Sequence, residues 1–297
     1  SGNQDTAEAI RAALIEAGFD AGMINIAPFY ADTLRMGLEK GADVFTMLMR
    51  TSQPEDAAAF EQWSTTLSES MRVYRVTPKA ETPVNAYAYP ALTPRGTGVH
   101  EVQSLPEADK ALDQIRQSLI AQYGGEYDYE EFTARIAVPE GMTGYLNDEN
   151  AQGDNRDTSY LMTNDFTLNS DEDFVVVYGV NHVAAGKATY ANTVLYARPR
   201  LNGIVSLYDS MYGDSAAEYL PDVDSSKYYV LKMARTALDS HTAVIPYSTD
   251  NPNGRFYGAD NGTQLLIAYR AYVEPETGVG PSYYEIVYDR AIVFHKK

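Results

Sequence analysis

Hydrophobic residues recur at helical spacing in the first third of the chain. The pattern Ser-x-Pro-Glu occurs at residues 52–55 and 104–107, where the serine and glutamate side chains can bond the first free amides of a helix. Apolar residues then follow at helical spacing: Phe60, Trp63, Leu67 and Met71 after the first start, and Ala108, Leu112, Ile115 and Leu119 after the second. Shorter patterns predict helices over residues 5–17 and 28–38. We therefore expect a helical N-terminal part.

Strand patterns replace the helical ones from about Thr133. Residues 174–178 are continuously apolar, as in a strand buried on both faces, and residues 189–197 alternate between two faces. Further strands are predicted over residues 204–208, 228–233, 265–273 and 284–294, with turn residues between them. Many short strands with few helices between them favour an antiparallel sandwich or barrel over a parallel sheet.

These patterns predict an α+β fold, in which a helical N-terminal part packs against an antiparallel β-sandwich-like C-terminal part. The change of pattern divides the chain into residues 1–124, mostly helical, and residues 125–297, rich in strands. Residues 84–92 have a strand pattern inside the helical part. They are a candidate strand of the C-terminal sheet, in which case the chain would cross the boundary between the two parts.

The composition is that of a soluble globular protein with an acidic surface. The chain has 297 residues, of which 44% are hydrophobic, which is enough for a sizeable core. It carries 41 Asp and Glu against 23 Lys and Arg, a net charge of −18. Such a surface repels phosphate backbones, so we expect no nucleic-acid partner. Because no apolar run approaches the roughly 20 residues of a membrane span, we also expect no membrane insertion.

Residue usage favours an extracytoplasmic location. Tyr outnumbers Phe by 24 to 9, and tyrosine suits half-exposed positions where the ring is buried and the hydroxyl reaches water. Together with the acidity, this favours a periplasmic or secreted protein whose leader has been removed ahead of Ser1-Gly2. The chain contains no cysteine, which excludes disulfides, thiolate metal sites and cysteine nucleophiles. No pattern indicates an oligomeric state.

Motifs for catalysis are weak. Gly186-Lys187 lacks the spacing of a phosphate-binding loop and is interpreted as a turn between strands. Gly213-Asp214-Ser215 resembles the G-D-S block of the GDS-type esterases, in which that block lies near the N-terminus of an α/β protein. Here the block lies in strand-rich sequence, and Asp239-Ser240-His241 has D-x-H spacing where those esterases have D-x-x-H. We therefore interpret residues 213–215 as an exposed turn.

No pattern predicts a metal ion or a cofactor. The four histidines, His100, His182, His241 and His295, do not pair at the spacing of metal ligands. Acidic clusters occur at residues 147–150, 154–157, 171–173 and 222–224. Their spacing does not match a calcium-binding loop, so we interpret them as solvated loops and expect neither metal nor cofactor.

His182 is the strongest candidate for a functional side chain. It follows the buried strand of residues 174–178 at a turn that contains glycine, where scaffolds often display functional groups. There His182 could act as a general base or bind a ligand, while Asn181 and Lys187 orient or neutralise an anionic group. The alternative is a structural histidine, whose ring is held by a hydrogen bond within its own turn.

Two functional hypotheses remain open, and no catalytic residue is assigned. The candidate ligand-binding residues are Tyr178, Asn181, His182, Lys187, Tyr190 and Arg270. The first hypothesis is a non-catalytic extracytoplasmic binding or interaction protein, whose tyrosines contact a small molecule, a glycan or a protein. The second is a hydrolase-like enzyme with a site around His182 and Lys187 that acts on a small acidic substrate. An enzyme requires a pocket that contains His182, whereas a binding protein would present tyrosines on a shallow groove or flat face.

Overall fold

The computed structural model describes residues 3–27, 39–44, 56–76, 78–80, 83, 85–88, 93–137, 156–248 and 258–297. Its contacts divide the chain into two compact units, Ser1–Leu92 and Thr93–Lys297. Four features predicted from the sequence lie outside the described residues. They are the helix over residues 28–38, the helix start at 52–55, the acidic cluster at 147–150 and, apart from its last two residues, the acidic cluster at 154–157. The described part of the predicted strand 84–92, residues 85–88, has no regular secondary structure.

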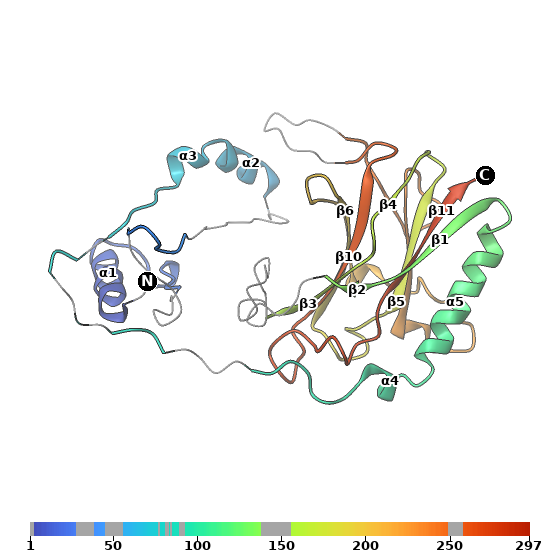
Figure 1. The fold of residues 1–297 in the computed structure, drawn as a ribbon, viewed down its shortest axis with the longest axis horizontal. Coiled ribbons are helices and arrows are strands. Elements are labelled where there is room, and N and C mark those ends of the chain that lie inside the picture. The colour runs from blue at the N-terminus through green and yellow to red at the C-terminus, as the bar shows by residue number, and fades with distance from the viewer. Residues whose placement is uncertain are drawn as a thin grey trace. The chain divides into compact units, whose positions relative to one another are not determined.

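The regular secondary structure described in the first unit is helical (Figure 1). Its helices are α1 (Gln4–Glu16), the 3-10 helix η1 (Ala21–Met23), α2 (Ala57–Thr65) and α3 (Leu67–Ser70). The side chain of Asn3 accepts from the amide of Thr6 and so begins α1, and Asp56 does the same for α2 through Ala59. Polar caps of this kind satisfy amides that have no partner within the helix. The helical spacing over residues 60–71 is thus realised as two short helices.

The second unit contains two helices, two 3-10 helices and all the strands of the described chain. The helices are α4 (Glu101–Ser104) and α5 (Ala108–Tyr123), and the 3-10 helices are η2 (Asp209–Met211) and η3 (Ser225–Lys227). The strands are β1 (Tyr127–Thr133), β2 (Arg135–Ile136), β3 (Thr158–Met162), β4 (Phe166–Thr167), β5 (Phe174–Val180), β6 (Tyr190–Ala197), β7 (Asn202–Tyr208), β8 (Tyr228–Ala234), β9 (Thr242–Val244), β10 (Gln264–Tyr272) and β11 (Arg290–Lys296).

These strands form two sheets that are antiparallel apart from one pair. Sheet A has the order β1-β11-β5-β8-β9, with β8 and β9 parallel, and sheet B has the order β2-β3-β10-β6-β7, with β4 paired to β10. One apolar cluster contains inward-facing residues of both sheets, among them Val175 and Val177 of β5 and Leu265 and Ile267 of β10. The two sheets therefore share a core.

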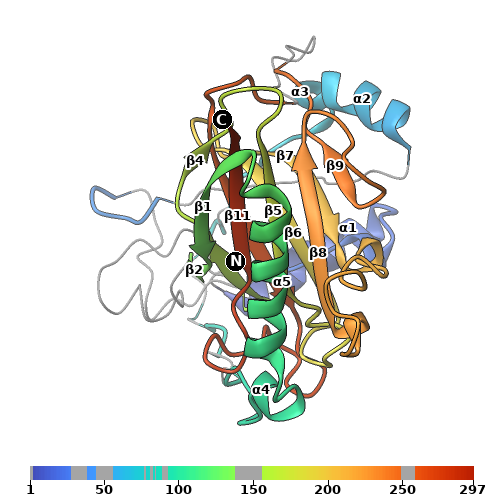
Figure 2. The ribbon, with the colours of Figure 1, turned by 90° about the vertical axis from the view of Figure 1, so that its right-hand side faces the viewer.

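Helix α5 covers the other face of sheet A, where it runs alongside β1, β5, β8 and β11 (Figure 2). Its apolar stripe of Leu112, Ile115 and Leu119 lies in a second cluster with Phe174 and Val176 of β5. Strand β5 is thus buried on both faces, which explains its unbroken run of apolar residues. The change from helical to strand pattern at residue 124 lies inside this second unit.

The coarse prediction of an α+β fold is confirmed, with helices toward the N-terminus and antiparallel strands toward the C-terminus. The predicted strand over residues 284–294 is shorter than expected, because β11 begins only at Arg290. Residues 284–289 form a turn, a bend and an irregular segment instead, in which two carboxylates, Glu285 and Asp289, are buried. None of the described helices has the length and apolar character needed to cross a membrane.

Candidate functional site

His182 lies in a closed loop at the end of β5. Its carbonyl accepts hydrogen bonds from the amides of Lys187 and Ala188, at 2.8 and 3.1 Å. Gly186 has a φ of +82°, a conformation that glycine adopts without strain, and this allows the chain to turn back. The loop carries His182 inward, so that only 4% of the residue is exposed.

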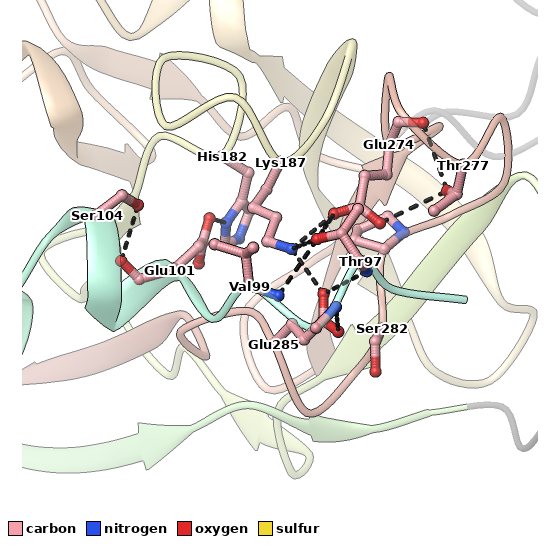
Figure 3. Close-up of polar contacts among 12 residues, drawn as sticks. Thr97, Val99, Glu101, Ser104, His182, Lys187, Glu274, Thr277, Ser282 and Glu285 are labelled. Carbon is pink, nitrogen blue, oxygen red and sulfur yellow. Dashed lines mark hydrogen bonds and ion pairs between the residues drawn. The ribbon is translucent and has the colours of Figure 1, made fainter. Parts of the chain in front are cut away.

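The imidazole of His182 lies between two buried carboxylates, those of Glu101 and Asp289, and Figure 3 shows the contact with Glu101. Its Nδ1 is 2.7 Å from Oε1 of Glu101, and its Nε2 is 3.6 Å from Oδ2 of Asp289. The other oxygen of each carboxylate is also bonded: Glu101 accepts from the amide of Val287 at 2.6 Å, and Asp289 accepts from the hydroxyl of Tyr229 at 2.6 Å. The expectation that His182 bonds within its own turn is therefore wrong, since Glu101 lies 81 positions away in the chain.

These carboxylates keep His182 positively charged. Burial alone would lower the pKa of the imidazole, but the charge of Glu101 and the hydrogen bonds with Asp289 and Glu101 raise that pKa to about 10. At neutral pH both ring nitrogens therefore carry protons and act as donors. A histidine in this state has no free lone pair with which to accept a proton from a substrate.

The pH dependence of His182 tests this assignment. An imidazole in an unfolded chain titrates near pH 6.5, and in the folded protein near 10. Because the folded state binds the extra proton between these values, the free energy of unfolding should fall as the pH rises from about 6.5 to 10. Ring ¹⁵N chemical shifts, assigned by comparison with His182→Gln, should remain those of imidazolium at pH 8. A ring that titrates near pH 6.5 would contradict the buried ion pair.

Lys187 makes a second buried ion cluster beside the first. Its Nζ lies 2.6 Å from Oε1 of Glu274, 2.6 Å from Oε2 of Glu285 and 3.3 Å from the hydroxyl of Thr97. Glu285 also accepts from the amides of Thr97 and Gly98, at 3.0 and 2.8 Å. Burial opposes the charge of Lys187, but the hydrogen bonds with Glu274 and Glu285 raise its pKa overall. Burial would raise the pKa of Glu285, and the bonds from Lys187, Gly98 and Thr97 lower it.

We call these six side chains the buried clamp: Glu101, His182, Lys187, Glu274, Glu285 and Asp289. The clamp joins the segment of residues 97–101, which precedes the sheets, to the loop after β5 and to the segment before β11. Gly96 lies against it with a φ of +86°, and a Cβ at that position would meet Oε1 of Glu285 at 2.3 Å. Each acidic or basic group of the clamp is paired with another member of the clamp, as is expected of a site that stabilises the fold and does not bind a ligand.

Tyr178 and Asn181 also have structural surroundings. Tyr178 is 1% exposed and lies in the cluster between sheet A and α5, where burial raises the pKa of its hydroxyl to about 12. The side chain of Asn181 accepts from the amide of Ala184 at 3.2 Å, within the loop after β5. The six predicted site residues therefore do not form one site: four belong to the interior or to this loop, and Tyr190 and Arg270 lie elsewhere.

Tyr190 and Arg270 lie on the outer face of sheet B, on neighbouring strands. Alternate residues of a strand point to opposite sides, so positions 190, 192, 194 and 196 of β6 share a face while Leu195 points into the core. Cross-strand pairing places Tyr160, Arg270, Asn192 and Tyr208 in one row, with Tyr272 and Tyr190 as the next pair. We call the following set the tyrosine face: Tyr160, Tyr190, Asn192, Tyr196, Tyr208, Arg270 and Tyr272.

Side chains of the tyrosine face hold one another in place. The guanidinium carbon of Arg270 lies 5.3 Å from the ring centre of Tyr160 and 5.5 Å from that of Tyr196. Its amino groups donate to the hydroxyl of Tyr196 at 2.7 Å and to Oδ1 of Asn192 at 3.3 Å. The ring centre of Tyr190 lies 5.3 Å from that of Tyr272. All seven residues are half-buried, so rings and guanidinium retain exposed surface in a fixed arrangement.

The segments 214–215 and 239–241, which carry the esterase-like G-D-S and D-x-H patterns, line a hollow of about 270 Å³ elsewhere on the second unit. His241 Nε2 lies 3.4 Å from Oδ1 of Asp214. Ser215 is buried, and its hydroxyl accepts from the amide of Val230 at 3.1 Å. Neither Ser215 nor Ser240 hydrogen-bonds the imidazole of His241 among the described contacts, so the hollow lacks the nucleophile–base pair of a serine hydrolase.

No group of three or more Asp, Glu or His side chains among the described residues could hold a metal ion.

Comparisons with known proteins show similarity over part of the chain only. No family model matches the chain. Two curated proteins named "Probable ribonuclease FAU-1", from Pyrococcus horikoshii (strain ATCC 700860 / DSM 12428 / JCM 9974 / NBRC 100139 / OT-3) and Pyrococcus abyssi (strain GE5 / Orsay), are each 30% identical to it over 111 residues. Each match covers 36% of this chain and 22% of the relative, so the chain matches about a fifth of the length of these proteins.

Proposed function

We propose that this chain is a non-catalytic, extracytoplasmic binding protein that takes up a glycan on its tyrosine face. The observation that carries the proposal is the set of five tyrosines and one arginine ordered across strands β3, β10, β6 and β7. The proposed scaffold is an antiparallel β-sandwich of sheets A and B, with α5 on the far side of sheet A. Such a scaffold would hold the tyrosine face rigid, as a binding surface requires.

Tyrosine is well suited to this role. Its ring offers a flat apolar surface and its hydroxyl a hydrogen bond, and only two side-chain torsions must be ordered on binding. In the tyrosine face that ordering is already present, because Tyr190 contacts Tyr272 and accepts from the side chain of Asn192 at 3.3 Å. A saccharide would bind with little further loss of side-chain entropy.

The buried clamp argues against the enzymatic alternative. A hydrolase-like site around His182 and Lys187 would need a base with a free lone pair and a cation free to hold an acidic substrate. In the clamp, His182 is charged between Glu101 and Asp289, and Lys187 is bonded to two glutamates. We therefore assign the clamp to stability and the tyrosine face to binding.

Single-stranded RNA is the second candidate ligand. The similarity to probable ribonucleases over 111 residues favours it, and aromatic side chains on a sheet can stack on bases. The net charge of −18 opposes it, because strand binding draws most of its affinity from several cations near the phosphates. Arg270 is the one cation among the seven residues of the tyrosine face.

The double variant Tyr190→Ala/Tyr272→Ala tests the proposal. It removes two rings that contact each other and should weaken glycan binding at least tenfold, as expected when two aromatic contacts worth about 1 kcal/mol each are lost. The full chain is screened against an array of defined oligosaccharides, and affinities for those that bind are measured by isothermal titration calorimetry. Tyr284→Ala is the control, since that tyrosine is 81% exposed and lies outside the tyrosine face.

Two results would contradict the proposal. One is an array on which no saccharide binds the wild-type chain. The other is a double variant that keeps its melting temperature and its full affinity, which would move the binding surface away from the tyrosine face. Single-stranded RNA is titrated under the same conditions, and tight RNA binding that the double variant loses would favour the second candidate.

A further inference from the structure

We infer that Arg270 makes the tyrosine face selective for acidic saccharides, by pairing its guanidinium with the carboxylate of a uronic acid. This inference rests on the proposed glycan binding and adds the chemical class of the ligand. The tyrosine rings would contact the sugar, and the guanidinium would contact the charged group that distinguishes a uronic acid from a neutral sugar.

The first support is that Arg270 has no acidic partner. Three arginines of the described second unit are paired with carboxylates: Arg116 with Glu131, Arg198 with Asp165 and Arg290 with Asp109. Arg235 instead donates to the carbonyls of Ile245 and Pro246 and to Asn261, so it is held within the fold. Among the residues that the structure describes, Arg270 forms no salt bridge, and its hydrogen bonds go to an amide and a phenol oxygen. Arg270 is half-buried and its charge is not compensated by a carboxylate of the described residues, so it is available to pair with an anionic group of a ligand.

The second support is the donor geometry of the guanidinium. An arginine has five N–H donors, and Arg270 uses one for Asn192 and one for Tyr196. Three donors therefore remain without a partner in the described residues. The rings of Tyr160 and Tyr196 lie close to the guanidinium and limit its motion. A guanidinium held in this way is suited to two parallel hydrogen bonds with a planar carboxylate.

The third support is the distance between charge and rings. Arg270 and Tyr272 are two positions apart on β10 and point to the same side, a separation of about 7 Å along the strand. Tyr190 is paired with Tyr272 across the sheet. One saccharide can therefore reach the guanidinium with its carboxylate and the rings with its sugar. A single cation also fits a ligand with isolated charges better than a polyphosphate, which needs several cations.

The test compares one oligosaccharide in two charge states. Aldotetraouronic acid, a xylotriose that carries a single 4-O-methylglucuronic acid, and its methyl ester have the same rings, and only the acid carries a carboxylate. Isothermal titration calorimetry on the full chain should find the acid bound at least tenfold more tightly than the ester. Arg270→Gln should remove this preference and leave affinity for the ester within about twofold, whereas Arg198→Gln, the control, should retain the preference.

The outcomes separate this inference from the proposed function. If wild type binds acid and ester equally and Arg270→Gln changes neither, the inference is overturned while glycan binding stands. If neither form binds although neutral saccharides do, the inference is overturned as well. Tighter binding of a single-stranded RNA oligonucleotide than of the acid also overturns it. Should Arg270→Gln fail to fold, Arg270→Lys is measured instead, because lysine keeps the charge but lacks the paired N–H donors of the guanidinium. Arg270→Lys should reduce the preference for the acid. An unchanged preference would count against the inference.

Discussion

Replacement of His182 by glutamine should lower the free energy of unfolding by about 3–5 kcal/mol, the range seen when one partner of a buried ion pair is removed. Glutamine can fill most of the space of the imidazole and donate one hydrogen bond, but it carries no charge. Glu101 and Asp289, which are 0% and 3% exposed, would then face each other without a cation between them. Urea denaturation at pH 7 measures the loss as a lower midpoint at constant slope.

The matched control is His241→Gln. That side chain is 29% exposed and lies 3.4 Å from an exposed carboxylate, so the same substitution should change the free energy of unfolding by less than about 0.5 kcal/mol. A second variant, Glu101→Gln, removes the other partner. The double variant His182→Gln/Glu101→Gln should be more stable than the sum of the two losses implies, because it leaves fewer uncompensated charges.

An unchanged denaturation midpoint in His182→Gln would overturn the structural assignment of this residue. Lost ligand binding together with that midpoint would identify residues 178–190 as the binding region. The structural assignment predicts the opposite pattern: His182→Gln should lose stability and keep its affinity for the glycan, measured at a temperature where the variant is folded.

Replacement of Lys187 by methionine should have an effect of similar size, about 3–5 kcal/mol. Methionine keeps most of the length of the side chain and removes the charge that lies 2.6 Å from both Glu274 and Glu285. Both glutamates are buried, so two carboxylates would lose their common cation. The affected amides are those of Thr97 and Gly98, which donate to Glu285.

Hydrogen exchange locates this second effect. Exchange at Thr97 and Gly98 should become faster in Lys187→Met than the change in global stability accounts for, because residues 97–101 lose part of their attachment. Lys110→Met is the control, since that lysine is 81% exposed and forms a surface pair with Glu107. Its free energy of unfolding should change by less than about 0.5 kcal/mol. Unaltered exchange at Thr97 and Gly98 in Lys187→Met would show that the clamp does not hold this segment.

The buried clamp and the tyrosine face have different proposed roles in the second unit, the first in stability and the second in binding. The clamp uses six acidic or basic side chains to attach the start of α4 to the loop after β5 and to the segments after β10 and before β11. The tyrosine face uses regular strands, where the pleat places its side chains on one side of the sheet and their contacts with one another hold them. The proposed binding surface is therefore placed on the more rigid of the two kinds of element.

Local spacing was sufficient to predict the elements that pack against the core. The stripe of Leu112, Ile115 and Leu119 predicted α5 and its buried side, and the apolar run of residues 174–178 predicted β5. Strand β1 escaped the prediction in most of its length, because it lies at the edge of sheet A and six of its seven residues are exposed or half-buried. An edge strand of this kind has no apolar alternation from which it could be recognised.

The sequence by itself determined that this chain is acidic, free of cysteine, helical toward its start and strand-rich toward its end. It also drew attention to His182, Lys187, Tyr190 and Arg270. Only the tertiary structure decided that His182 and Lys187 are paired with buried carboxylates. It also decided that Tyr190 and Arg270 share a surface. The partners of His182 and Lys187 lie 81 to 107 positions away, and the tyrosine face exists only through the pairing of strands distant in the chain. Ion pairing and cross-strand register depend on proximity in space, which local periodicity does not encode.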